Sequence, residues 1–237
     1  MASELSRSDV AEHRTATRAL VRDLFLAYLG AWVVGILYGM VIRATSSWND
    51  GAAWERETLR WFHAWSLPRW LDALVLQIPL TGTNLTILPI ALVVGWWLWK
   101  KKHRGIISVQ LLVVTIGSLS LNPTMKYLLG RERPDIYPRR GMYSWASYPS
   151  GHAILALAVY FTVALLLYRS RGWRWPFIVA PLVFLANAYS RLYLAVHWPT
   201  DLIGGLLIGL VWLVGTWRAF ARHPEHRVAL MRRTPRP

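Results

Sequence analysis

The chain has 237 residues, of which 54% are hydrophobic and 16% are charged, and it carries a formal net charge of +15. Soluble globular domains have fewer apolar and more charged residues, so this composition indicates a membrane protein. The sequence contains no cysteine, which excludes disulfides, thiolate metal sites and a cysteine nucleophile and leaves the redox compartment open.

The positive charge is concentrated in short basic runs at the ends of apolar segments, such as Lys100–Arg104 and Arg169–Arg174. Runs of this kind are typical of the cytoplasmic flanks of membrane helices. Nucleic-acid binding is the alternative for so basic a chain, and this distribution argues against it. We therefore expect the lipid bilayer, and not nucleic acid, as the partner.

The first apolar run is Leu20–Ile42, which is long enough to cross a hydrocarbon core of about 30 Å. Residues 1–19 before it are polar and mixed in charge, and we expect them to form a cytoplasmic tail. A signal peptide is the alternative, but its apolar region would be shorter and its cleavage site would be rich in small residues. We interpret the run as an uncleaved membrane helix.

An amphipathic segment follows at Ser46–Trp70, where Asn49 or Asp50 could cap a helix. On that helix one stripe collects five side chains: Trp54, Thr58, Trp61, Phe62 and Trp65. The charged residues of the segment fall elsewhere on the helix: Glu55, Arg56 and Arg60. We expect this helix to lie in the membrane interface rather than to span the bilayer. A solvated loop is the alternative, which the density of tryptophan disfavours.

Five further apolar stretches predict spanning helices near residues 71–99, 106–126, 153–168, 176–193 and 200–220. The first of them is interrupted by Pro79 and by Gly82–Asn84, so we expect a short entering segment and a break before its spanning part. Residues 221–237 are basic and contain proline, and we expect a poorly ordered cytoplasmic tail. The sequence therefore predicts an all-α polytopic membrane protein. Its domain, residues 20–220, would have six transmembrane helices plus the interfacial amphipathic helix after the first.

The basic residues also predict the orientation. Both tails and the two basic runs fall on one side of a six-helix arrangement, and the positive-inside rule makes that side cytoplasmic. We expect a multi-pass protein of the plasma (inner) membrane with its polar segments on the extracytoplasmic side. Four arginines on that outer side depart from the rule: Arg131, Arg133, Arg139 and Arg140. A phosphate site would account for at least one of them.

The first of three polar segments contains Lys126 and Arg133, which are seven residues apart, about two helical turns. Gly130 and Pro134 favour a helix that ends before the arginine, so we expect the lysine on the helix and the arginine in a loop. A planar guanidinium and a point-charge ammonium both suit phosphate oxygens. The alternative is a pair of basic residues at a helix end that binds lipid headgroups.

The second polar segment is Pro149–His152. Here Ser150 is predicted to cap the next helix, and Gly151 lets its backbone N–H approach an anion closely. A helix N-terminus with free N–H groups favours anions, and His152 would stand beside such an anion. The alternative is an ordinary helix cap with a histidine there by chance.

The third polar segment runs from Ser190 to Asp201. His197 and Asp201 are four residues apart, about one helical turn, although Pro199 between them makes that geometry approximate. A carboxylate that accepts one imidazole N–H leaves the other ring nitrogen free to attack, and Arg191 adds a further cation. The alternative is that Asp201 caps the last helix while His197 is an interfacial aromatic residue.

Together the three segments resemble the type 2 phosphatidic acid phosphatase (PAP2) superfamily, whose pattern is Lys-x6-Arg-Pro, then Pro-Ser-Gly-His, then Ser-Arg-x5-His-x3-Asp. All fixed positions of that pattern are present in order. The resemblance implies that His197 is a nucleophile that forms a phosphohistidine, that Asp201 orients it, and that His152 protonates the leaving oxygen. It also implies the ligands of the phosphate oxygens: Lys126, Arg133, Ser150, Gly151 and Arg191.

The resemblance implies an integral membrane phosphatase that removes the terminal phosphate of a lipid or polyprenyl (di)phosphate on the outer face of the membrane. Candidate substrates are phosphatidic acid, phosphatidylglycerol phosphate and undecaprenyl diphosphate. The sequence contains no acidic cluster suited to Mg²⁺, so we expect catalysis without a metal or another cofactor. The choice among these lipids, the preference for monophosphate or diphosphate, and the oligomeric state all stay open.

Two alternatives to a lipid phosphatase also stay open. One is a vanadate-dependent haloperoxidase of the same superfamily, although such enzymes resemble soluble helical proteins and this chain has apolar segments of spanning length. The other is a non-catalytic lipid-binding or transport protein of the same fold.

Overall fold

The computed structural model describes residues 7–45, 48–65, 67–100, 105–137 and 143–231. Within these residues every regular element is a helix, and a single isolated bridge pairs Glu132 with Ala146. The predicted all-α class is therefore confirmed for this part of the chain.

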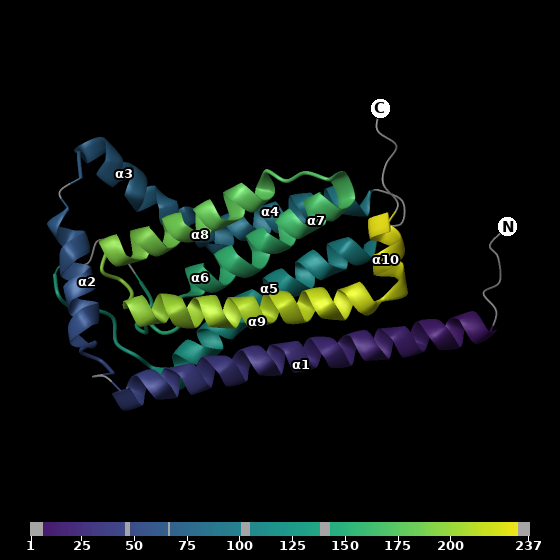
Figure 1. The fold of residues 1–237 in the computed structure, drawn as a ribbon, viewed down its shortest axis with the longest axis horizontal. Coiled ribbons are helices and arrows are strands. Elements are labelled where there is room, and N and C mark those ends of the chain that lie inside the picture. The colour runs from purple at the N-terminus through teal and green to yellow at the C-terminus, as the bar shows by residue number, and fades with distance from the viewer. Residues whose placement is uncertain (1–6, 46–47, 66, 101–104, 138–142, 232–237) are drawn as a thin grey trace.

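In chain order the elements are α1 (Arg7–Thr45), α2 (Ala53–Ala64), α3 (Arg69–Gln77), the 3-10 helix η1 (Ile78–Gly82), α4 (Asn84–Trp99), α5 (Gly105–Leu129), α6 (Gly151–Leu155), the π-helix η2 (Ala156–Tyr160), α7 (Phe161–Arg171), α8 (Pro176–Tyr193), α9 (Pro199–Arg222) and α10 (Pro224–Met231). The long helices lie side by side in one elongated bundle (Figure 1). Helix α2 stands across one end of the bundle, and α10 lies at the other end near the start of α1.

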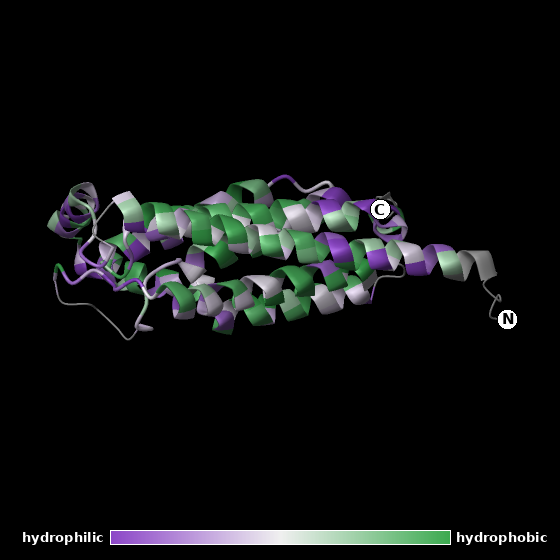
Figure 2. Ribbon diagram, turned by 90° about the horizontal axis from the view of Figure 1, so that it is seen from below, coloured by the Kyte–Doolittle hydropathy of each residue, from purple (hydrophilic) through white to green (hydrophobic). Residues whose placement is uncertain are grey.

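Hydropathy divides the bundle along its length. Hydrophobic residues dominate the middle of the long helices, and hydrophilic residues gather toward the two ends (Figure 2). In the described part of the chain four helical segments are long and apolar enough to cross a membrane: α1, α5, the continuous segment Gly151–Arg171 and α9. A fifth span results if Arg69–Gly82 and Asn84–Trp99, which are bent by 53° at their break, are counted as one. The protein is thus a membrane protein.

Helix α8 was predicted as a further span, but it is not among these five. Its last turns contain Asn187, Ser190 and Arg191, which lower its mean hydropathy, and all three side chains are buried against the rest of the protein. A helix that turns polar residues inward can still present an apolar face to lipid, as the exposed side chains of Ile178 and Leu182 do here.

The predicted interruption of the second apolar stretch is confirmed. Helix α3 ends at Gln77, and a short 3-10 segment, Ile78–Gly82, with Pro79 in its first turn, follows before α4 begins. Proline lacks the N–H that would continue the α-helical hydrogen bonding, so the chain changes direction here.

The structure corrects the expected disorder of the C-terminal tail. At the other end helix α1 begins at Arg7, so most of the polar segment before the first apolar run is helical. In the expected C-terminal tail, α10 is a helix that packs on α5, where His226 Nε2 lies 2.7 Å from Gln110 Oε1 and both residues are fully buried. Helix α1 and α10 also contact each other, through His13 Nε2 and Glu225 Oε1 at 2.8 Å. Tertiary contacts therefore order a C-terminal segment whose composition suggested disorder.

Helix α2 differs from the prediction at its start. Its N-cap is Ala52, not Asn49 or Asp50, and the side chain of Glu55 accepts the backbone N–H of Ala52 at 2.9 Å. The three tryptophans of the predicted stripe are exposed and its other two residues are half-buried, whereas Glu55 and Leu59 are buried against the protein.

Some of the predicted features lie outside the described residues. These are Arg139 and Arg140, all of the basic run after Lys100, and the ends of the chain at residues 1–6 and 232–237.

Two adjacent glycines on α9 allow the Pro149–His152 segment to lie directly on that helix. A Cβ at Gly205 would stand 2.6 Å from the backbone oxygen of Ser150, and one at Gly204 would meet the ring of Tyr148. The Tyr148 hydroxyl donates to the backbone oxygen of Gly35 on α1 at 2.6 Å. This close packing of a loop between α1 and α9 fixes the start of α6.

Candidate active site

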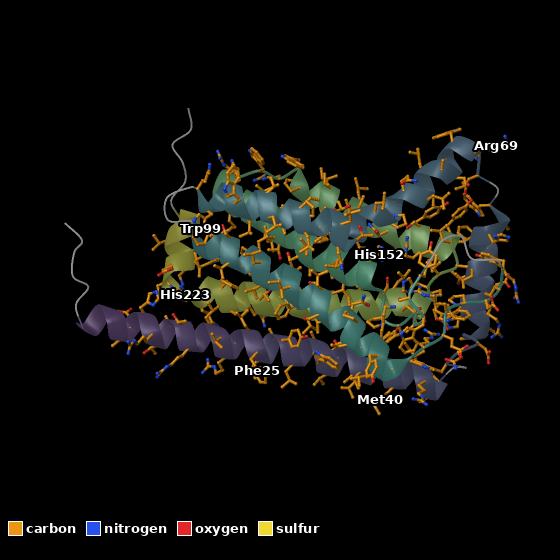
Figure 3. The ribbon with its side chains drawn as sticks, turned by 180° about the vertical axis from the view of Figure 1, so that it is seen from behind. Phe25, Met40, Arg69, Trp99, His152 and His223 are labelled. Carbon is orange, nitrogen blue, oxygen red and sulfur yellow. The ribbon has the colours of Figure 1, made fainter. Side chains whose placement is uncertain are left out.

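A cavity of about 390 Å³ lies at the end of the bundle that α2 and α3 surround. His152 is inside the bundle toward that end, while Trp99 and His223 mark the opposite end (Figure 3). The residues that line the cavity are Gly82, Thr83, Asn84, Leu85, Asn122, Lys126, Arg133, Tyr143, Ser144, Gly151, His152, Leu155, Arg191 and His197. Six of the eight predicted site residues are in this set. The other two, Ser150 and Asp201, are buried immediately behind it.

The first polar segment is arranged as predicted. Helix α5 ends at Leu129, and Gly130 adopts a left-handed φ of 60° while its N–H donates to the backbone oxygen of Lys126 at 3.0 Å. This conformation terminates the helix, because glycine has no Cβ to oppose it. Lys126 therefore lies in the last turn of α5, and Arg133 reaches the cavity from the following loop.

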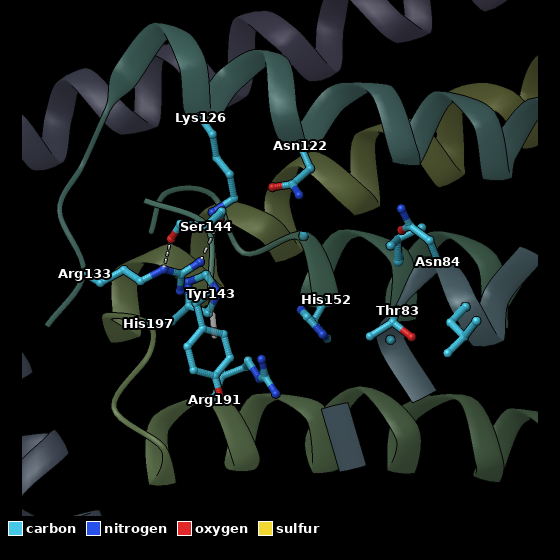
Figure 4. Close-up of a pocket in the computed structure, with 14 residues that line it drawn as sticks. Thr83, Asn84, Asn122, Lys126, Arg133, Tyr143, Ser144, His152, Arg191 and His197 are labelled. Carbon is cyan, nitrogen blue, oxygen red and sulfur yellow. Dashed lines mark hydrogen bonds between the residues drawn. The ribbon is translucent and has the colours of Figure 1, made fainter. Parts of the chain in front are cut away.

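These two cations also hold the loop that leads to α6 (Figure 4). Lys126 Nζ donates to the backbone oxygens of Ala146 and Ser147, the latter at 3.1 Å. Arg133 Nε donates to the backbone oxygen of Ser144 at 2.6 Å, and Nη2 donates to its hydroxyl at 3.0 Å. Arg133 Nη1 donates further to the backbone oxygen of Val196, next to His197. One guanidinium thus connects two of the three polar segments.

Other polar atoms around the cavity have no hydrogen-bond partner among the described residues. They are the Ser150 hydroxyl, His152 Nε2, and the Nε and Nη2 of Arg191, all of them buried. Ser150 is the N-cap of α6, as expected, and its hydroxyl makes no capping hydrogen bond. Buried donors without partners are costly, so their gathering here indicates the place of an anionic ligand.

His197 and Asp201 face each other at the start of α9. His197 Nδ1 lies 3.4 Å from Asp201 Oδ2, and the Trp198 backbone N–H donates to the same oxygen at 2.8 Å. The carboxylate of Asp201 therefore makes both contacts that the sequence offered as alternatives: it contacts the imidazole of His197, and it caps the start of α9. With Nδ1 toward the carboxylate, the remaining ring nitrogen of His197 is available to the cavity.

The electrostatics of this site favour a neutral imidazole. Burial lowers the pKa of His197 far below its ordinary value, and the positive charges of Arg133, Lys126 and Arg191 lower this pKa further. At neutral pH the ring therefore keeps a lone pair, which a nucleophile requires.

Residues 107–225 match the PAP2 superfamily. The chain belongs to this superfamily. Two of its relatives are a phosphatidylglycerophosphatase B from Bacillus subtilis (strain 168), 32% identical over 149 residues, and an undecaprenyl-diphosphatase from Sulfolobus acidocaldarius, 32% identical over 127 residues. The first match covers 60% of this chain and 71% of the relative. The second covers 50% of this chain and 55% of the relative, so the chain spans about half of that protein.

Among solved structures, this PAP2 protein is similar to the transmembrane PAP2 type phosphatidylglycerolphosphate phosphatase from Bacillus subtilis. The TM-score is 0.69 at 22% sequence identity, over 81% of this chain and 94% of the other. At this level of identity the likeness establishes a shared fold.

The sequence pattern did not indicate two groups of site residues. Asn122 lies against Gly151, close enough that a Cβ on the glycine would overlap its amide, and its position four residues before Lys126 was an available signal. Arg131 and Glu55 are buried beside Asp201. Arg131 forms an ion pair with each carboxylate, at 2.8 Å from Asp201 Oδ1 and at 2.9 Å from Glu55 Oε2. Nothing in the local sequence around Glu55 marks it, because its partner lies 76 residues further along the chain.

Proposed function

We propose that this protein hydrolyses the terminal phosphate of a lipid or polyprenyl (di)phosphate through a phosphohistidine on His197. The observation that carries the proposal is a cavity where a neutral imidazole, in contact with a carboxylate, meets three buried cations, one of which, Arg191, has unfilled donors. The names of the relatives, a phosphatidylglycerophosphatase and an undecaprenyl-diphosphatase, support this class of substrate.

In the first step the phosphate oxygens would be held by Lys126, Arg133, Arg191, the Ser150 hydroxyl and the Gly151 N–H. The free ring nitrogen of His197 attacks phosphorus in line with the leaving oxygen, and the cations neutralise the charge that spreads over the phosphoryl oxygens. The bond between phosphorus and the leaving oxygen breaks. A protonated His152, favoured beside a phosphate dianion, gives its proton to that oxygen.

In the second step water cleaves the P–N bond. His152, now neutral, takes a proton from the attacking water, in accordance with microscopic reversibility. Inorganic phosphate leaves, His197 regains its lone pair, and His152 loses its proton to solvent until the next phosphate dianion binds beside it. Throughout both steps Asp201 holds the imidazole of His197 and stabilises its positive charge.

We infer that α8 is the sixth span and that the cavity opens on the extracytoplasmic side. An α-helix of this length, 18 residues, is about 27 Å long, close to the thickness of the hydrocarbon core. Six spans put both chain ends on one side. Exposed arginines near the ends of α7 and α9, such as Arg169, Arg174 and Arg222, support that side as cytoplasmic. Helix α2, with its exposed tryptophans, would lie in the opposite interface.

Purified protein in detergent micelles is expected to release inorganic phosphate from a panel of phosphatidic acid, phosphatidylglycerol phosphate and undecaprenyl diphosphate. Release should persist in EDTA, because the proposed charge neutralisation comes from side chains. Vanadate should inhibit, because it mimics pentavalent phosphorus. A colorimetric phosphate assay with each lipid measures all three effects.

Different outcomes would exclude the proposal in different ways. Loss of activity in EDTA that Mg²⁺ restores would contradict catalysis by the cations alone. No phosphate release from any lipid would favour the non-catalytic alternative, and peroxide-dependent halide oxidation after vanadate addition would favour a haloperoxidase. Among the three lipids we expect kinetic preference rather than exclusion, because apolar contacts distinguish similar tails by only a few kcal/mol at most.

Single cysteines in this cysteine-free chain are expected to report the orientation. Glu57→Cys on α2, where the native side chain is 73% exposed, should react in intact cells with a membrane-impermeant maleimide. Arg174→Cys, in the exposed turn between α7 and α8, should react only after the membrane is opened. Mass-shift labelling on a gel measures both reactions. The reverse pattern would place the cavity at the cytoplasmic face.

A further inference from the structure

A buried ion-pair network lies directly behind the His197–Asp201 pair, outside the cavity itself. Arg131 Nη1 donates to Asp201 Oδ1 at 2.8 Å, and Nη2 donates to Glu55 Oε2 at 2.9 Å. All three side chains are 0% exposed. Glu55 is on α2, Arg131 is in the loop after α5 and Asp201 is on α9, so the network joins three separate parts of the fold.

All three guanidinium nitrogens of Arg131 donate hydrogen bonds. Its Nε donates to the backbone oxygen of Trp48 at 2.8 Å, and Nη1 donates also to the Thr200 hydroxyl at 2.7 Å. The rings of Trp48 and Trp198 lie 5.3 and 5.4 Å from its Cζ. Because the guanidinium is planar and rigid, these contacts fix the direction in which it donates to Asp201.

Both carboxylate oxygens of Glu55 also accept hydrogen bonds. Its Oε2 accepts from Arg131 and from the Ala52 N–H. Its Oε1 accepts from the Thr200 hydroxyl at 2.5 Å and from the Thr200 N–H at 3.3 Å. Thr200 directly precedes Asp201, so this one carboxylate connects α2 to the first turn of α9.

These contacts decide which oxygen of Asp201 meets the imidazole. Arg131 occupies Oδ1, so only Oδ2 is left for His197. We propose that Glu55 is a positioning residue: by holding Arg131, it keeps the Asp201 carboxylate in the orientation that fixes the tautomer of His197. This inference rests on the phosphohistidine function proposed above.

Glu55 also affects the charge that His197 experiences. Without it, the single positive charge of Arg131 would offset Asp201, and the carboxylate would stabilise an imidazolium less well when the P–N bond forms. With Glu55 present, one guanidinium is shared by two carboxylates, and Asp201 keeps its effect on the ring. The role is therefore specific to the transition state and should appear in kcat more than in KM.

Glu55→Gln tests the proposal, because it keeps the shape of the side chain and removes its charge. We expect kcat for a short-chain phosphatidic acid to fall about 10- to 100-fold, the usual cost of losing a partner that orients a reactive histidine. KM should change little. The matched control is Glu57→Gln, on the same helix but exposed, which should retain the kinetics of the native protein.

A double-variant cycle separates positioning from a merely structural role. If Glu55 acts through Asp201, adding Glu55→Gln to Asp201→Asn should lower kcat by no more than about two-fold beyond Asp201→Asn alone. A loss equal to the product of the two single losses would overturn the proposal, as would a native kcat in Glu55→Gln.

A second variant keeps the test valid if Glu55→Gln does not fold. Glu55→Met/Arg131→Met/Asp201→Asn replaces the buried Glu55–Arg131 pair by apolar side chains and neutralises Asp201, so that no carboxylate of the network is left buried without its partner. We expect this variant to stay folded, as judged by its thermal transition, with a kcat within about two-fold of that of Asp201→Asn alone. A folded triple variant whose kcat lies about ten-fold or more below that of Asp201→Asn would overturn the proposal. Failure of the proposed function itself would look different, because the native protein would then release no phosphate or His197→Ala would remain active.

Discussion

His197→Ala is expected to abolish phosphate release, with a loss of kcat of roughly 10⁴-fold or more, because the displacement then lacks its nucleophile. Asp201→Asn should leave slow activity, since orientation of the ring is impaired while the attacking nitrogen remains. Phosphate release from micellar lipid measures both losses. Rapid quenching of His152→Ala with radiolabelled substrate should additionally trap acid-labile, alkali-stable phosphate on the protein.

The control for this experiment is His13→Ala, which changes an exposed histidine at the opposite end of the bundle and should leave the rate unchanged. The thermal transition of each variant shows whether its fold is intact. Near-normal turnover in a folded His197→Ala protein would disprove the phosphohistidine mechanism.

Arg191→Met is expected to lower kcat/KM by about 10²- to 10³-fold, the usual effect of removing one charged donor from a transition state. The same variant should be as stable as the native protein or more stable. The reason is that Arg191 is 2% exposed and its Nε and Nη2 have no partner among the described residues. A buried guanidinium with unfilled donors costs stability, which the apolar side chain restores.

Arg133→Met provides the contrast. Its guanidinium donates to Ser144 and to Val196, so this variant should lose activity and stability together. The two effects are measured by steady-state kinetics and by thermal unfolding of both proteins. Equal destabilisation in the two variants, or native kcat/KM in Arg191→Met, would contradict the assignment of Arg191 to the phosphate.

Local interactions determined much of the structure around the site, and the sequence predicted that part. Helix α8 has the predicted bounds Pro176–Tyr193, and α9 starts one residue before the predicted position, at Pro199. Gly130 ends α5 as expected, so that Arg133 comes from a loop. Helix starts and ends depend on backbone conformations and on contacts within a turn or two, which a sequence displays directly.

The resemblance of the three polar segments to the PAP2 pattern also implied which side chains meet, and six of those eight residues line the cavity. Their roles remain proposals that the variants above test. The sequence was less informative about single contacts within the segments. Ser150 is the N-cap of α6 as expected, but nothing in the segments indicated that the Arg133 guanidinium donates to the backbone oxygen of Val196.

Only the tertiary structure decided the surroundings of the site. Glu55 is charged and sits on an amphipathic helix, a pattern typical of a solvated position, yet it is fully buried because Arg131 and Thr200 satisfy it from distant parts of the chain. Helix α10 is ordered for the same reason, through Gln110 on α5. The sequence by itself determined the apolar helices of spanning length, the helix ends around the site and most of the side chains that line the cavity, since these depend on hydropathy and near neighbours. The burial of a charge depends on partners that only the packed fold brings together.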